Sequence, residues 1–242
     1  MTSIQAGGRT VDHVTRAVLF DFYGTLARAV SWGPRTEEVF SQHGITLAEG
    51  AWDLWGDMDV IDGFEHVEHS ASRDAYVAWE LHRLRERALA CGVGPDDIEA
   101  LVRDLHVARK TFTLEAYPEV APVLEELRRR SVMVAVCSNW DWDLDRALSE
   151  TGLDSLVDVA VTSARAGARK PHPRIYRYTL DLCAVDPANA LFVGDSWGPD
   201  VEGPRTAGLR PVYVRRNDDR RQPPEGDAVI SVPDLRPVLD LV

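Results

Sequence analysis

VLFDFYGT, residues 18–25, is the stretch of this 242-residue chain that decides its fold. Its first three residues are apolar, and a glycine-threonine turn follows shortly after them. A short apolar run bounded by turn signals is typical of a strand buried inside a parallel sheet. Parallel sheets bind ligands at the carboxyl ends of their strands, so Asp21 lies where a catalytic group is expected.

The rest of the chain divides into a helical part and an alternating part. Residues from about 34 to 110 show helical periodicity with no convincing strand. After Tyr117, strand patterns such as VMVAVCS alternate with helical patterns such as PRIYRYTLDLCA. This alternation indicates βαβ units and a parallel sheet.

We therefore predict an α/β fold: a Rossmann-like, three-layer parallel sheet core with an inserted all-helical cap domain. The core is expected to comprise residues 16–30 and 115–242, and the cap residues 31–114. The first strand of the core precedes the insert, and all later strands follow it.

Composition restricts the partners and the compartment. The net charge of −12 argues against nucleic acid as a partner, because phosphate backbones bind positive surfaces. No apolar run approaches the roughly 20 residues of a membrane span. The three cysteines lack metal-type spacing, and an odd count fits reduced thiols. We expect a cytoplasmic protein that binds neither nucleic acid nor membrane, and the sequence gives no prediction of its oligomeric state.

Polar groups follow the predicted strands of the core. Asp21, Ser138, Asn139 and Asp195 come at strand ends, and Lys170 precedes a helix. Two carboxylates can share a Mg²⁺ ion, which also takes waters and substrate phosphate oxygens. Lysine supplies a compact positive charge, and a carboxylate can attack phosphorus to give an aspartyl-phosphate. This combination points to phosphoryl transfer from a small phosphorylated substrate.

At these residues the chain resembles the haloacid dehalogenase-like hydrolase superfamily, in the subfamily with a helical cap after the first strand. The resemblance covers roughly residues 16 to 215 and rests on four motifs in order. Each motif alone is weak, but all four at predicted strand ends or their loops form a strong signal. The motifs are Asp21-Phe22-Tyr23-Gly24-Thr25, Ser138-Asn139, Lys170-Pro171, and Gly194-Asp195 with Asp200.

The resemblance implies a role for each matched residue. Asp21 is expected to be the nucleophile, Lys170 to balance charge, and Tyr23 occupies the position of the catalytic acid. The expected substrate contacts are Gly24, Thr25, Ser138 and Asn139.

The resemblance also implies a Mg²⁺ site. Asp195 is expected to bind the ion and Asp200 to orient its waters. Asp21 and the backbone carbonyl of Tyr23 are expected to be the further ligands.

Tyr23 leaves the reaction open between two classes. Family phosphatases have a second aspartate there, which protonates the leaving oxygen, whereas haloacid dehalogenases commonly have tyrosine and use no metal. The dehalogenases, however, commonly have serine in place of Asp195. They also bind the substrate carboxylate with an arginine early in the cap. Residues 36–72 contain no arginine or lysine but nine acidic residues: Glu37, Glu38, Glu49, Asp53, Asp57, Asp59, Asp62, Glu65 and Glu68.

These observations favour a Mg²⁺-dependent phosphatase that hydrolyses a small phosphorylated metabolite through an aspartyl-phosphate. The alternatives are a metal-independent 2-haloacid dehalogenase and a non-catalytic binding protein on the same fold. Losing the general acid would lower the rate by on the order of 10²–10⁴, which a good leaving group makes tolerable.

Aromatic and histidine residues give weaker signals. His66 and His69 are spaced like a metal pair, but a polar helix face is the preferred interpretation. A substrate pocket and plain packing are equally compatible with Trp32, Trp140, Trp142 and Trp197. Trp52, Trp55 and Trp79 are expected in the core of the cap.

Overall fold

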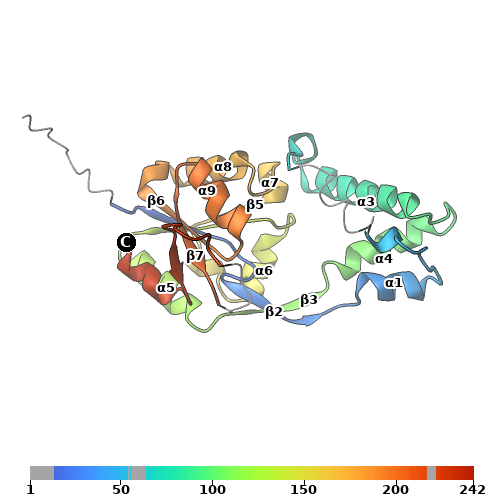
Figure 1. Ribbon diagram of the computed structural model, residues 1–242, viewed down its shortest axis with the longest axis horizontal. Coiled ribbons are helices and arrows are strands. Elements are labelled where there is room, and N and C mark those ends of the chain that lie inside the picture. Colours follow the sequence, from blue (N-terminus) through green and yellow to red (C-terminus); the bar gives the residue numbers. More distant parts are fainter. Residues whose placement is uncertain (1–13, 54, 56–63, 217–221) are drawn as a thin grey trace, which may run out of the picture.

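A computed structural model describes residues 14–53, 55, 64–216 and 222–242 (Figure 1). Its central feature is a six-stranded sheet with the order β5-β4-β1-β6-β7-β8, in which all neighbouring strands are parallel. The strands are β1 Ala17–Phe20, β4 Met133–Ser138, β5 Val159–Thr162, β6 Ala190–Gly194, β7 Arg210–Val214 and β8 Ile230–Val232.

Strand β1 lies in the interior of the sheet because none of its residues needs contact with water. All four residues are apolar and fully buried. Phe20 pairs with Val136 of β4 on one side and with Val193 of β6 on the other. The residues that follow these three strands therefore meet at one edge of the sheet.

Helices cover both faces of the sheet, as predicted for a three-layer core (Figure 1). Val18 and Phe20 pack in one apolar cluster with α5 (Val120–Arg129) and α6 (Leu144–Glu150). Ala17 and Leu19 face the other way and pack in a second cluster with α8 (Pro173–Cys183). The alternation of side chains along β1 thus joins the two layers of helices to the sheet.

An insert of helices follows the first strand. It contains α1 (Thr36–Gln42), α3 (Arg73–Ala90) and α4 (Ile98–Ala108). These helices have their own apolar cluster, separate from the two clusters of the core. Figure 1 shows the insert as a distinct lobe beside the sheet.

A two-stranded antiparallel ribbon connects the lobe to the core. It pairs β2 (Ala27–Trp32) with β3 (Phe112–Ala116). We predicted no strand in either segment. The domain boundaries expected after residue 30 and before residue 115 fall inside this ribbon. The division into core and cap at those residues stays a prediction.

Two smaller features complete the core. The segment after β6 contains a π-helix (Gly198–Glu202) followed by the short α9 (Gly203–Thr206). Strand β8 at the sheet edge was not predicted, and two of its three residues are exposed. Within the described ranges, no helix has both the length and the apolar character to cross a membrane.

Candidate active site

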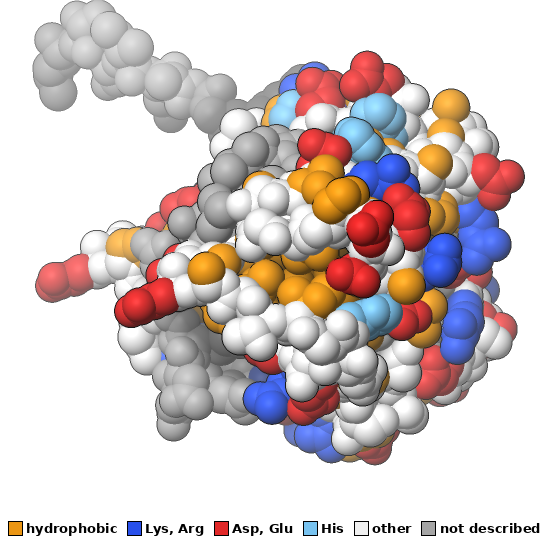
Figure 2. Space-filling view, turned by 90° about the vertical axis from the view of Figure 1, so that its right-hand side faces the viewer, with side chains coloured by type: hydrophobic (Ala, Val, Ile, Leu, Met, Phe, Trp, Pro, Cys, Tyr) orange, Lys and Arg blue, Asp and Glu red, His pale blue; other side chains and the backbone are white. Residues whose placement is uncertain are grey.

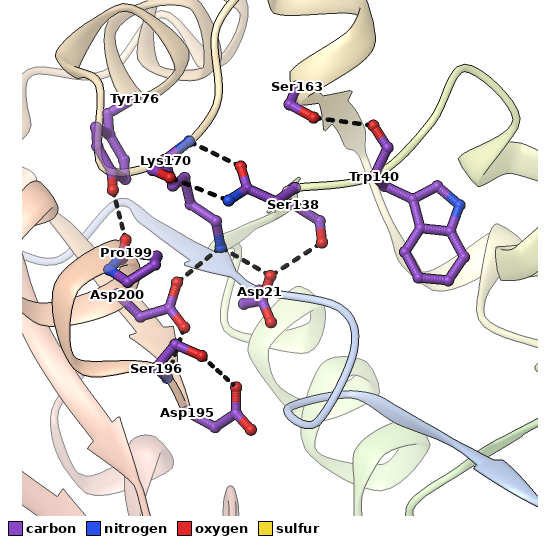
Figure 3. Close-up of polar contacts among 11 residues, drawn as sticks. Asp21, Ser138, Trp140, Ser163, Lys170, Tyr176, Asp195, Ser196, Pro199 and Asp200 are labelled. Carbon is purple, nitrogen blue, oxygen red and sulfur yellow. Dashed lines mark hydrogen bonds and ion pairs between the residues drawn. The ribbon is translucent and has the colours of Figure 1, made fainter. Parts of the chain in front are cut away.

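Asp21 follows β1 directly and is the centre of a buried polar cluster (Figure 3). Its Oδ1 atom accepts a hydrogen bond from Ser138 Oγ at 2.9 Å and another from Lys170 Nζ at 2.7 Å. Ser138 is the last residue of β4, the strand next to β1. The sheet therefore brings together the first two predicted catalytic motifs.

Lys170 bridges two carboxylates. Its Nζ also donates to Asp200 Oδ1 at 2.7 Å, and its side chain is 2% exposed. The ammonium group lies 5.0 Å from the centre of the Phe192 ring. Burial alone lowers the pKa of Lys170, but Asp200 and Asp21 outweigh it, so the pKa is above its usual value and the lysine stays charged. For Asp200, burial raises the pKa of the carboxyl, and Lys170 opposes that shift.

Asn139 fixes the loop that carries the lysine. Its amide Nδ2 donates to the Lys170 carbonyl at 3.0 Å, and the Lys170 N–H donates to Asn139 Oδ1 at 2.7 Å. The next residue, Trp140, is held in turn, since its carbonyl accepts from Ser163 Oγ at 3.0 Å (Figure 3). The side chain of Asn139 thus positions Lys170, and its expected contact with substrate stays a prediction.

Three carboxylates form the candidate metal centre. Asp21, Asp195 and Asp200 are all buried, and each offers an oxygen within 4.8 Å of the others. Among the described residues, this is the only group of three or more acidic, histidine or cysteine side chains arranged in this way. Oxygen donors of this kind fit Mg²⁺, and a cation would relieve the repulsion between them.

Gly24 makes room for this centre. Its φ angle is +88°, in the left-handed region that glycine adopts readily. A Cβ atom at this position would lie 2.2 Å from Asp195 Oδ2. The glycine of the first motif is thus required by the close approach of its backbone to the Asp195 carboxylate.

Tyr23 and Thr25 lie in the same loop, but they point to different environments. The Tyr23 side chain is 38% exposed, and its ring packs edge-on against Trp32 of β2 at 6.0 Å. Thr25 is fully buried, and its hydroxyl has no hydrogen-bond partner among the described residues. Its carbonyl accepts from Arg216 Nη2 at 2.6 Å. Thr25 was expected to contact substrate, and its full burial gives that expectation no support.

A cavity of about 220 Å³ lies between the helical insert and the core. Asn139 and Trp140 line it from the core, and they follow Ser138 in the chain. The full lining is His66, Tyr76, Trp79, Glu80, Arg83, Arg109, Lys110, Phe112, Asn139, Trp140, Asp141, Ser163 and Arg169. This position suits the part of a substrate that extends away from Asp21.

His66 is not on a polar helix face, and that interpretation of the sequence was wrong. It precedes the short 3-10 helix η1 (Val67–His69), is 4% exposed, and stacks on Trp79 with ring centres 4.7 Å apart. Trp79, expected inside the cap core, instead lines the cavity. Local periodicity could not reveal this, because His66 is buried by contacts with Tyr76 and Trp79, which lie further along the chain.

The other tryptophans differ in whether they pack in a core or line the cavity. Trp197 serves packing: it is 6% exposed, its ring meets the Tyr213 ring edge-on, and its Nε1 donates to Glu202 at 2.8 Å. Trp140 lines the cavity. Trp55 packs on Phe40 of α1 and against the apolar cluster of the insert, as predicted for the core of the cap. Trp52 also contacts Phe40, but it is 37% exposed, so its prediction as a core residue was wrong.

The acidic run at the start of the insert does not line the cavity where it is described. Glu38 pairs with Arg35, and neither Glu37 nor Glu65 is among the lining residues. Asp57, Asp59 and Asp62 lie outside the described residues. Figure 2, which faces the lobe, shows acidic side chains spread over this outer surface. The acidic composition of residues 36–72 is therefore no argument against a substrate with a carboxylate group. Asp195 remains the feature that argues against a dehalogenase.

One known protein family matches most of this chain. A family profile for haloacid dehalogenase-like hydrolases matches residues 15–208. The chain belongs to this family, and it is a hydrolase.

Curated relatives include both enzyme classes. A phosphoserine phosphatase of Thermus thermophilus is 36% identical over 155 residues, covering 64% of this chain and 61% of that protein, so less than two thirds of its length is matched. Phosphatase MT3486 of Mycobacterium tuberculosis is 31% identical over 85% of this chain and 89% of its own. The (S)-2-haloacid dehalogenase 4A of Burkholderia cepacia is 30% identical over 87% and 86%. The phosphatase relatives favour a phosphatase over a dehalogenase.

Solved structures support the fold. A phosphatase of this family from Thermococcus onnurineus covers 94% of this chain and 97% of its own, with a TM-score of 0.62 and 23% identity. The L-2-haloacid dehalogenase of Xanthobacter autotrophicus covers 94% and 98%, with a TM-score of 0.63 and 24% identity. The architecture is thus shared by both classes, and the site residues must distinguish them.

The contact between Gly24 and Asp195 yields a prediction. Gly24→Ala should displace the Asp195 carboxylate, weaken Mg²⁺ binding measured by calorimetry, and lower turnover at least tenfold. The matched control is Gly44→Ala, because Gly44 also has a positive φ of +67° but nothing within 4 Å of an added Cβ. The control should lower the free energy of unfolding by about 1–2 kcal/mol and keep full turnover. Equal losses of activity in both variants would contradict this account of Gly24.

Proposed function

We propose that this protein is a Mg²⁺-dependent phosphatase that hydrolyses a small phosphorylated metabolite through an aspartyl-phosphate on Asp21. The observation that carries the proposal is the buried cluster of Asp21, Asp195 and Asp200 beside the ammonium of Lys170. The family dehalogenases commonly lack the aspartate at position 195 and use no metal. A buried group of three acids has a clear use if a cation binds there.

Asp21 performs the nucleophilic step. Its Oδ1 is held by Ser138 and Lys170, so Oδ2 is the oxygen that attacks phosphorus. The new bond joins Oδ2 to phosphorus while the ester P–O bond breaks, and the leaving oxygen departs as an anion that takes its proton from water. Water then attacks the phosphorus of the aspartyl-phosphate, which releases inorganic phosphate and restores the carboxylate.

Asp21, Asp195 and Asp200 would hold the metal, with the Tyr23 carbonyl as a further proposed ligand. Bound Mg²⁺ supplies positive charge that neutralises the phosphate oxygens. Lys170 contributes a second fixed charge, and it keeps Asp21 oriented for attack. Ser138 donates to Asp21 Oδ1 at rest and is positioned at the start of the loop that receives the phosphate.

A second candidate function is a metal-independent 2-haloacid dehalogenase. Tyr23 favours it, because the family dehalogenases commonly have tyrosine at this position. Relatives of both classes also cover most of the chain. In that reaction Asp21 would displace halide from carbon, and no general acid would be needed.

Substitution and metal removal separate these functions. Asp21→Asn removes the attacking charge, so turnover of p-nitrophenyl phosphate should fall to background while circular dichroism stays unchanged. EDTA and Asp195→Asn should each abolish most of this activity, and Mg²⁺ should restore only the EDTA-treated wild type. Full phosphate release in EDTA would contradict the proposal, and metal-free halide release from 2-chloropropionate would establish the dehalogenase. A protein that does neither would be a binding protein.

The tyrosine predicts a dependence on the leaving group. Without an aspartate acid, aryl phosphates should be hydrolysed well and alkyl phosphates poorly, by a factor on the order of 10²–10⁴. Tyr23→Asp should raise alkyl phosphate rates and flatten the plot of log kcat/KM against leaving-group pKa.

Tyr23→Phe is the matched control for the hydroxyl. It should leave the slope unchanged if the phenol donates no proton, and lower only alkyl phosphate rates if it does. Rapid cleavage of alkyl phosphates by both the wild type and Tyr23→Phe would show that another group is the acid. Folding and Mg²⁺ affinity of each variant are checked first, because the aspartate variant exchanges a large ring for a charge.

A further inference from the structure

The cavity between the insert and the core adjoins both catalytic loops. Asn139 in its wall follows Ser138, and Arg169 in its wall precedes Lys170. A group bound in the cavity therefore lies beside the loops that carry Ser138 and Lys170. The cavity is the natural place for the leaving group of the substrate.

Positive charge exceeds negative charge in this wall. Four cationic side chains, Arg83, Arg109, Lys110 and Arg169, face two acidic ones, Glu80 and Asp141. The whole chain has a net charge of −12, so this local excess runs against its composition.

The two acidic residues of the wall share one cation, which offsets one of their two charges. Both contact the same ammonium group: Lys110 Nζ lies 3.1 Å from Glu80 Oε2 and 3.2 Å from Asp141 Oδ2. The remaining positive charge therefore belongs to the arginines. Arg83 lies over the Trp79 ring at 4.4 Å.

Arg109 and Arg169 complete the wall from opposite sides, one at the end of α4 and one in the Lys170 loop. Among the described residues, neither guanidinium group has an acidic partner. Arginine presents a planar fork of donors that matches the oxygens of a carboxylate or a phosphate.

His66 is a buried ring beside Arg169 in this wall. Its ring is buried, and neither ring nitrogen has a hydrogen-bond partner at normal geometry among the described residues. Burial, with Arg169 and then His69, lowers the pKa of His66 to about 4. The ring is neutral at neutral pH, so it leaves the positive charge of the wall to the arginines, and the backbone of Ser163 and Phe64 lies beside it.

Backbone hydrogen bonds hold Arg169 and His66 in place. The Arg169 N–H donates to the Phe64 carbonyl at 2.7 Å, and the His66 N–H donates to the Gly167 carbonyl at 2.8 Å. A Cβ on Gly167 would lie 2.8 Å from Val67 Cα, so the insert and the core loop are in close contact. Arg169 and His66 are thus preorganised at one side of the cavity.

We propose that this cavity binds a second anionic group, a carboxylate or a phosphate, on the leaving group of the substrate, through Arg169 and Arg109. The inference rests on the proposed phosphatase function for its orientation, with the first phosphate at Asp21. It defines the substrate class as monoesters whose leaving group is itself anionic, and it distinguishes them from neutral sugar or alkyl phosphates.

Matched substrate pairs test this inference. One pair is 3-phosphoglycerate and glycerol 3-phosphate, which differ by a carboxylate against a hydroxymethyl group. The other is propane-1,3-diol bisphosphate and propyl phosphate. The wild type should prefer the anionic member of at least one pair by about 10- to 100-fold in kcat/KM, the size expected for hydrogen bonds to a charged group. The preferred pair identifies carboxylate or phosphate as the ligand.

Variants assign the preference to the cavity. Arg169→Met and Arg109→Met should each remove most of it by raising KM for the anionic member of the pair, while KM for the neutral member changes much less. Arg103→Met is the control, because Arg103 is an exposed residue of α4 outside the cavity wall. Arg109→Met decides the matter if the variant next to Lys170 does not fold.

Binding is measured separately from turnover, so that the two proposals can fail independently. Calorimetric titration of Asp21→Asn with 3-phosphoglycerate and the bisphosphate should show tighter binding than with their neutral counterparts. If the protein releases no phosphate from any ester, the phosphatase proposal fails, but this titration still tests the cavity. Equal affinity within both pairs, or equal loss of p-nitrophenyl phosphate and anionic ester turnover in the arginine variants, would overturn the inference.

Discussion

The ammonium group of Lys170 connects the parts of the site that the chain keeps far apart. It contacts Asp21 after β1 and Asp200 in the π-helix after β6, at 2.7 Å each, in a region closed to water. Removing one member of such a buried group leaves the other charges unpaired, which destabilises proteins by about 3–5 kcal/mol. The position of the nucleophile and of the candidate metal ligands therefore depends on this one lysine.

The backbone around the lysine is shaped to admit the carboxylates. A Cβ on Gly194 would lie 2.4 Å from the Asp200 carboxyl carbon, and a Cβ on Gly24 would collide with Asp195. Two glycines thus bring two carboxylates close to Asp21. With Lys170 supplying one positive charge against three acids, a divalent cation is the group that best completes the charge balance.

The residues at the centre of the candidate site could be predicted, because a carboxylate at the end of a buried strand is recognisable from a short stretch of sequence. Apolar residues 18–20 followed by Asp21 predict a buried strand and a catalytic edge, and the structure has β1 in the interior of the sheet. The hydrogen bonds of Asn139 to Lys170 were not predicted, because only the fold brings its amide to the Lys170 backbone. The ribbon of β2 and β3 was missed for the same reason: it pairs segments about 80 residues apart, which periodicity cannot detect. The excess of positive charge in the cavity wall was not predicted, because the insert is acidic in composition and only the fold brings the lining residues together.

The most direct test of the central claim is to trap the intermediate. Wild-type protein with Mg²⁺ and p-nitrophenyl phosphate is quenched in acid during turnover, digested, and analysed by mass spectrometry. Our account predicts a phosphoryl group on the peptide that contains Asp21, absent when EDTA is added before the substrate. Steady phosphate release with no modification of that peptide, under quench conditions that preserve acyl phosphates, would contradict it.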